Sequence, residues 1–330
     1  MGLSVRIGAG TGVESLVAAA AVADADWRSV FTHGETAWSA ARSAGGAALT
    51  GQVGRFGRFG WINLVGLLTA RRPPWSHAVL LDLLASATAE DLHATLVGVR
   101  RHELRLHVDE ATLRRALTGD RDAGRRTRAA LEQTVVQVSP WLLRTPSATV
   151  RQVCLDTVAA LPAPAGRAPA SAATRARQAA VGDEVLIEEV APGVHYGPAV
   201  LEDVVLVTSA QVAPILVVVD EVDRTVILHP PLGAAGATDA AAPLRDLGRA
   251  VGDATRLRLL QELRTGRRTL GDLCAALDSP RTTLLHHLAL LRSAGLIEIA
   301  VVEAAPNVYS LRLDGFETLA QAARAFPLRS

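Results

Sequence analysis

The sequence has few of the residues that hold small secreted proteins together. Only two cysteines, Cys154 and Cys274, occur in 330 residues. A secreted disulfide scaffold needs several closely spaced cysteines, so this composition excludes that class. Two reduced thiols are typical of a cytosolic protein, and we therefore expect a cytoplasmic location.

The sequence also lacks long apolar runs. None reaches the roughly 18 residues of a membrane-spanning helix. The nearest, residues 204–219, contains several polar residues and Pro214. The Ala-rich start resembles part of a signal peptide, but Glu14 and the glycines of residues 8–12 interrupt it. We expect neither secretion nor a membrane partner.

Lysine is absent altogether. All 34 basic residues are Arg, and 33 acidic residues leave a net charge of +1. This balance excludes a strongly basic nucleic-acid coat protein, but it allows a DNA reader whose positive charge is local. Residues 1–177 carry a net charge of +7, residues 178–243 carry −9 and residues 244–330 carry +3. The near-neutral total is therefore a sum of unlike regions.

These three regions also differ in hydrophobic pattern, and together they predict an α+β fold. Residues 1–177 begin with a strand-like segment and continue with apolar residues three and four positions apart, which predicts a mainly helical sensor or oligomerisation region. Residues 178–243 hold β-branched runs between turn signals, which predicts a small, mostly antiparallel sheet and a linker. The helices are predicted at residues 89–99, 123–138 and 148–161, and the strands at residues 3–7, 185–187, 204–207, 215–219 and 226–228.

Residues 244–330 contain the most informative pattern. Asp253 is expected to cap a helix, and residues 269–277 form a second, short helix. After a turn, Ser279 is the expected N-cap of a third helix, with Pro280 at its first position and an end near Ser293. The leucines expected to face the core are Leu257, Leu260 and Leu263 of the first helix, Leu270, Leu273 and Leu277 of the second, and Leu284, Leu288 and Leu291 of the third.

The third helix should present a polar outer face that includes Arg281, Thr282 and His286. Gly295 then ends it, and residues 297–302 and 308–313 can pair as a β-hairpin. Two helices joined by a tight turn, followed by a hairpin, predict a winged helix-turn-helix, whose second helix enters the major groove of DNA.

This region resembles the ArsR family of winged-helix transcriptional regulators. The resemblance rests on residues 253–260 (DATRLRLL), Leu273 with Leu277, residues 286–297 (HHLALLRSAGLI) and residues 308–311 (VYSL). It implies a homodimer that binds double-stranded DNA at a palindromic operator, usually as a repressor released by an effector. It assigns DNA contacts to Ser279, Arg281, Thr282, Thr283, His286, His287 and Arg292, and dimer contacts to Leu244, Leu247, Phe316, Leu319 and Ala323.

The sequence departs from the family pattern in three places. Leu285 replaces a Ser before the histidine pair, where it could contact a thymine methyl group. The wing tip, residues 303–307, has no basic residue. Cys274 stands alone and residues 314–330 contain no His, so the metal sites of the family cannot form, because a tetrahedral soft-metal site needs several ligands. We expect no metal and no cofactor.

Several other features allow a functional and a structural interpretation. His102 and His107 are five residues apart, about 140° around a helix, which does not fit a zinc-protease helix. Residues 8–12 lack the Lys-Ser/Thr of a phosphate loop and fit a turn better. His33 and Glu35 fit a helix start better than a polar site. The tryptophans are most often core residues, but they could line an apolar ligand pocket: Trp27, Trp38, Trp61, Trp75 and Trp141.

The sequence thus favours a DNA-binding transcriptional regulator controlled by a small-molecule effector in its N-terminal region. No nucleophile–base pair or metal triad suggests an enzyme. The alternative is a protein-interaction module whose N-terminal region binds a protein partner and whose winged helix tethers it to DNA.

Overall fold

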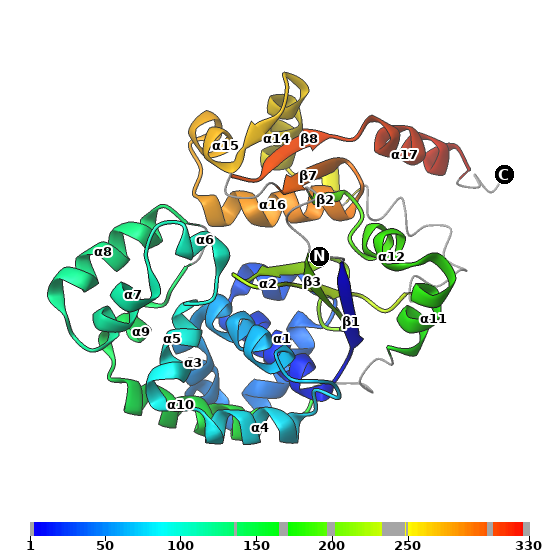
Figure 1. The fold of residues 1–330 in the computed structure, drawn as a ribbon. Helices are drawn as coiled ribbons and strands as arrows, with labels where there is room; N and C mark the ends of the chain where they lie inside the picture. The colour runs from blue at the N-terminus through cyan, green and yellow to red at the C-terminus, as the bar shows by residue number, and fades with distance from the viewer. Residues whose placement is uncertain are drawn as a thin grey trace. The chain divides into compact units, whose positions relative to one another are not determined.

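The computed structural model describes residues 3–134, 137–164, 171–196, 202–232, 248, 250–301 and 306–325. It divides into two compact units, and each is built from two stretches of chain (Figure 1). The N-terminal unit comprises Gly2–Thr174 and Asp203–Pro231, and the C-terminal unit comprises Arg175–Glu202 and Leu232–Ser330. The α+β class is confirmed. The two units do not coincide with the three regions expected from the sequence, because residues 178–243 are divided between the two units.

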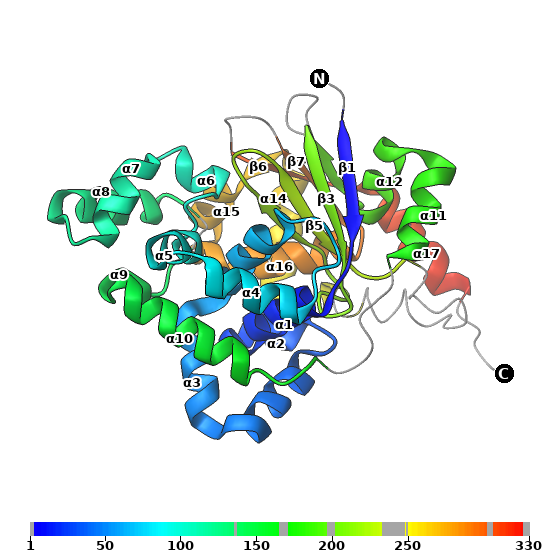
Figure 2. The ribbon, with the colours of Figure 1, turned by 60° about the horizontal axis from the view of Figure 1, so that its bottom comes forward.

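The N-terminal unit contains a four-stranded sheet, which lies beside its helices (Figure 2). Its order is β1-β3-β5-β4; β1, β3 and β5 are parallel, and β4 is antiparallel to β5. The prediction of a mostly antiparallel sheet was wrong here. Every residue of β5 and nearly every residue of β3 is buried, and continuous apolar strands buried on both faces are typical of parallel sheets. The strands are β1 Ser4–Gly8, β3 Asp203–Thr208, β4 Val217–Asp220 and β5 Thr225–His229.

Helices make up the rest of the N-terminal unit. The predictions at residues 89–99 and 148–161 are confirmed as α5 and α10. The helix predicted at residues 123–138 ends earlier, as α8, where the β-branched residues that follow disfavour a helix. The helices are α1 Thr11–Ala23, α2 Ala25–Val30, α3 Gly34–Thr69, α4 His77–Ser86, α5 Ala89–Val97, α6 His102–Arg105, α7 Glu110–Leu117, α8 Arg121–Glu132, α9 Pro140–Arg144 and α10 Ser147–Ala160. No described helix is long and apolar enough to cross a membrane.

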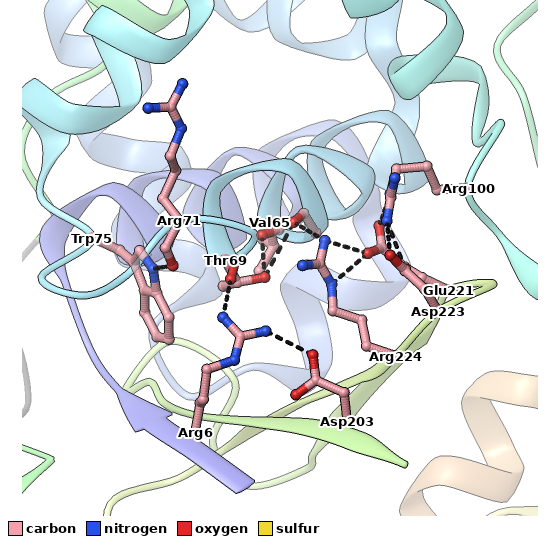
Figure 3. A network of polar contacts seen from close by, with 11 residues as sticks. Arg6, Val65, Thr69, Arg71, Trp75, Arg100, Asp203, Glu221, Asp223 and Arg224 are labelled. Carbon is pink, nitrogen blue, oxygen red and sulfur yellow. Dashed lines mark hydrogen bonds and ion pairs between the residues drawn. The ribbon is translucent and has the colours of Figure 1, made fainter. Parts of the chain in front are cut away.

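A buried network of charges joins α3 to the sheet (Figure 3). The Arg224 guanidinium forms an ion pair with the Glu221 carboxylate at 2.6 Å and donates to the Gly66 carbonyl at 2.9 Å. Arg100 pairs with Glu221 from the other side. Because a charge taken out of water is costly unless it is matched, this carboxylate needs both Arg partners. A side chain at Gly66 would place Cβ 2.2 Å from Glu221 Oε1, so glycine is required there.

The β1–α1 turn packs through its glycines against the segment that precedes α4. The Gly12 amide donates to the Trp75 carbonyl at 2.9 Å, and Gly10 lies so close that an added Cβ would meet that oxygen at 2.0 Å. The glycines of residues 8–12 thus form a tightly packed turn, as the sequence favoured.

The C-terminal unit combines helices with a second four-stranded sheet, ordered β2-β7-β8-β6. The run at residues 185–187, predicted to be a strand, lies in helix α12 instead, where Leu186 and Ile187 are buried. The elements are α11 Ala172–Val181, α12 Asp183–Val190, β2 Val194–Tyr196, α14 Ala254–Arg264, β6 Arg268–Thr269, α15 Leu270–Leu277, α16 Arg281–Ser293, β7 Ile297–Val301, β8 Val308–Leu311 and α17 Leu313–Ala325.

Gly10→Ala tests the packing of the β1–α1 turn. The added methyl group collides with backbone rather than with a flexible side chain, so we expect unfolding free energy to fall by roughly 1–3 kcal/mol or more in urea denaturation. The matched control is Gly124→Ala in α8, where nothing lies within 4 Å of the new Cβ. That change should stabilise the protein by about 0.5–1 kcal/mol. Equal effects of the two substitutions would contradict the packing argument.

Candidate nucleic-acid interface

Helix α14 opens the helix-turn-helix. The Asp253 carboxylate caps it by accepting from the Arg256 amide at 3.0 Å, which confirms the predicted cap. Its buried face contains Leu259 and Leu263 together with Arg256. The prediction for Leu257 was wrong, because this side chain is 46% exposed. A spacing of three residues fitted Leu257, Leu260 and Leu263, but the four-residue spacing of Leu259 and Leu263 sets the inner face.

The two following helices have the predicted lengths and core residues. Thr269 caps α15 through a capping box with Asp272, and Leu270, Leu273 and Leu277 are buried. Asp278 then makes the turn in a left-handed conformation, with φ of 48°. Ser279 does not cap α16 as predicted. Pro280 holds the N-cap position, and the Ser279 hydroxyl donates to the Leu277 carbonyl at 3.2 Å.

Helix α16 has an apolar face and a polar face. Leu284, Leu288 and Leu291 are buried, as their spacing predicted. On the other side, Thr283 is exposed and Arg281, Leu285 and His286 are half-buried. Arg281 also lies near the start of α15, because its Nη2 is 3.9 Å from the position of a Cβ at Gly271. The Thr282 side chain lies outside the described residues. The first two turns of α16 therefore present polar and apolar groups of the kinds that contact DNA.

His287 joins α16 to the cap of α14. Its Nδ1 is 3.2 Å from Arg256 Nη1 and 3.6 Å from the Asp253 carboxylate. Because a guanidinium only donates, Nδ1 accepts this hydrogen bond and the ring proton lies on Nε2. Burial raises the pKa of Asp253, but its hydrogen bond from the Arg256 amide and the nearby charges outweigh this and keep the pKa low. His287 thus has a structural contact that the sequence did not reveal.

Arg292 does not lie on the outer face of α16. It is 5% exposed, and its Nη1 lies 3.5 Å from the Pro192 carbonyl. Burial lowers its pKa to about 10, and the neighbouring Tyr196 and Tyr309 oppose that shift. The predicted DNA contact at Arg292 is therefore corrected, because a buried guanidinium cannot reach a base or a phosphate. Pro192, whose carbonyl lies against the Arg292 guanidinium, precedes β2. No pattern in the sequence linked this segment to α16.

The predicted hairpin is present, with β7 and β8 antiparallel in the register that pairs Ile299 with Tyr309. Its tip, residues 302–305, lies outside the described residues. Two further strands extend the sheet. β6 pairs with β8, and β2 adds in parallel to β7, with the Ile299 amide donating to the Gly193 carbonyl at 2.7 Å. Gly193 has φ of +73°, a conformation that favours glycine.

The structure describes only part of the predicted dimer surface. Leu244 and Leu247 lie outside the described residues. Phe316 is 38% exposed on α17, beside an exposed Leu313. Leu319 and Ala323 belong to the same helix, but their side chains are not among those described.

The five tryptophans differ in their burial. Trp61 and Trp75 are fully buried core residues whose indole N–H groups donate to the Val53 and Arg71 carbonyls. Trp27, Trp38 and Trp141 are half-buried, and each has an Arg guanidinium against its ring. The cleft described below has none of the five in its walls. Trp61 and Trp75 are thus core residues, and a ligand role for the other three stays a prediction.

Neither cysteine occupies a metal site within the described residues. Cys154 is buried, and desolvation raises the pKa of its thiol to about 12. Cys274 is half-buried, and burial raises its pKa although Arg281 lowers it. In the described part of the chain, no group of three or more His, Cys, Asp or Glu residues could hold a metal ion.

Comparison with known proteins agrees with this geometry. The model of a family described as a helix-turn-helix domain matches residues 251–300. These residues run from the start of α14 into β7, and so include the capped helix, the turn and α16. No curated protein and no solved structure matches the chain. A winged helix-turn-helix DNA-binding domain near the C-terminus is the class that the fold and the match define, and it indicates a regulator.

Arg292→Met tests whether the buried charge is needed for stability. Replacing a poorly paired buried charge by an apolar side chain of similar length is often neutral or stabilising. We expect the free energy of unfolding of the full chain to stay within about 1 kcal/mol of the parent or to rise. A loss of about 3 kcal/mol or more in denaturation would show instead that the guanidinium contacts hold the wing to α16.

Proposed function

We propose that this protein is a homodimeric, sequence-specific transcriptional repressor of the ArsR type. The observation that carries the proposal is the division of α16 into a leucine face buried in the unit and an outer face with Arg281, Thr283 and His286. In a helix-turn-helix, the N-terminal residues of such a helix contact base edges in the major groove. Arg can bind guanine through two hydrogen bonds, and His286 adds a polar contact one turn further along.

The proposed DNA-binding surface no longer includes Arg292. It consists of Ser279, Arg281, Thr282, Thr283, His286 and His287. Its positive charge is modest, so affinity depends on a few well-placed contacts rather than on a broad basic patch. Two copies related by a twofold axis would read a palindromic operator whose half-sites lie about one helical turn apart. A small-molecule effector bound in the N-terminal unit would bind the DNA-competent and DNA-released states with different affinity, and so control repression.

Matched substitutions at two arginines of α16 test the DNA surface. We expect Arg281→Met to weaken binding to DNA from the protein's own upstream region by about tenfold or more, because one good base contact contributes about 1–3 kcal/mol. Arg292→Met should leave the affinity unchanged. Fluorescence anisotropy across a salt series measures both, and the loss of a phosphate contact would also reduce the salt slope by about 0.9. Unchanged affinity of Arg281→Met combined with His286→Ala would overturn the assignment.

Substitutions in α17 test the dimer. A charge placed in an apolar interface must be desolvated, so Phe316→Glu should shift sedimentation from dimer towards monomer. The control is Gln321→Glu, which adds the same charge at an exposed position of the same helix. If both variants sediment like the parent protein, Phe316 is not part of the dimer interface.

The half-buried Trp27, Trp38 and Trp141 favour a second candidate function. Trp and Arg are enriched at protein interfaces, and here each indole carries an Arg against its ring. The N-terminal unit would then bind a protein partner, and the winged helix would tether that complex to DNA. Affinity purification of the full chain separates the two functions, because one stoichiometric partner that is lost in Trp38→Ala would favour tethering.

A further inference from the structure

The N-terminal unit contains a cleft of about 410 Å³, open mouth included. Its walls come from α1, from the first turns of α3, from the segment after α10 and from Gln211. The cleft lies near the carboxyl ends of the parallel strands β1 and β3. Helix α1 follows the carboxyl end of β1, and Gln211 follows the carboxyl end of β3, which is parallel to β1. Crevices outside the carboxyl ends of parallel strands are the usual ligand positions of open α/β sheets.

The walls define the chemistry of a ligand. Small apolar side chains from α1 and α3, including Ala18, Ala37 and Ala40, line most of the cleft. Leu161 and Pro162 close one side. No Asp, Glu or Arg is among the residues described around the cleft, so a charged ligand would have no counter-charge there. The body of the ligand should therefore be apolar and uncharged.

Four polar residues also line the cleft: Ser15, His33, Thr36 and Gln211. The Ser15 hydroxyl donates its proton to the Thr11 carbonyl at 2.9 Å and lies 3.2 Å from His77 Nδ1. With that proton committed, the Ser15 oxygen can only accept a further hydrogen bond. A ligand that donates one, such as a hydroxyl group, fits this atom.

The loop that carries Gln211 is held in place before any ligand arrives. The buried Glu14 carboxylate accepts from the Ala210 and Gln211 amides, both at 3.2 Å. Burial raises the pKa of Glu14 to about 7, and the hydrogen bonds it accepts oppose that shift. A pre-formed polar group beside an apolar wall is the usual form of a small-molecule site.

From this arrangement we propose that the cleft binds a small, uncharged alcohol, with its apolar body between α1 and α3 and its hydroxyl group toward Ser15 and Gln211. Its role as an effector rests on the proposed repressor function, but the binding itself does not.

The test titrates the full-length protein with phenol in the absence of DNA, using calorimetry. Saturable binding at one site per chain is expected. Toluene lacks the hydroxyl group and benzoate is charged, so both should bind at least about tenfold more weakly. No saturable binding of phenol, or equal or tighter binding of either analogue, would overturn the proposal.

Substitutions locate the site. Ala40→Leu places a larger side chain in the cleft and should weaken phenol binding about tenfold or more. Ala48→Leu makes the same change at an exposed position of α3 and should leave it unchanged. Ala37→Leu is a second lining variant if Ala40→Leu does not fold. Equal binding by parent and a folded lining variant would exclude this cleft.

A separate measurement keeps the two proposals apart. Phenol binding with unaltered DNA affinity would uphold the site and remove its regulatory role. DNA binding that phenol never influences, together with no phenol binding, would remove the site and leave the DNA-binding function standing.

Discussion

The parallel ladder between β2 and β7 is the contact on which the organisation of this chain depends. It brings residues 192–196 beside the wing, and these residues also cover the buried guanidinium of Arg292. Without them, a charged side chain at the end of α16 would lie in solvent or in an unmatched apolar space. The C-terminal unit is therefore complete only when this upstream segment is included.

A second set of contacts orients α16 from its other end. Asp253 caps α14, and Arg256 from the same turn reaches both the Ala250 carbonyl and His287. The cap of α14 and a side chain in the middle of α16 are thus parts of one hydrogen-bonded group. The leucines of α16 are buried, and Thr283 lies exposed on the same helix.

The C-terminal helices could be predicted from sequence because their signals are local. Caps at Asp253 and Thr269, the left-handed Gly295 and the leucine spacing of α16 each act over one or two turns. The position of Arg292 could not be predicted, because the group that covers it is 100 residues away in sequence. The three-residue strand β2 has too little pattern to be recognised, and its parallel partner is distant.

The N-terminal unit shows the same limit more strongly. Its apolar runs identified β3 and β5, but the parallel pairing of β3 with β1 joins residues about 200 positions apart. Periodicity could not separate the buried strand at residues 204–207 from the helical run at residues 185–187, because both are short and apolar. The tryptophans were ambiguous for a related reason. Their burial depends on the packing of α3, which contains non-helical glycines at Gly46 and Gly57.

The path of the chain between its two units limits how this architecture can be recombined. The chain enters the C-terminal unit at Arg175, returns to the N-terminal unit at Asp203 and leaves it again after Pro231. A winged helix attached to a domain by one linker can be exchanged by a single fusion. In this chain, a single fusion point between the units would separate either β2 from the wing or β3 from its sheet. The two units are therefore expected to be inherited together, and their properties have to change by substitution within each unit.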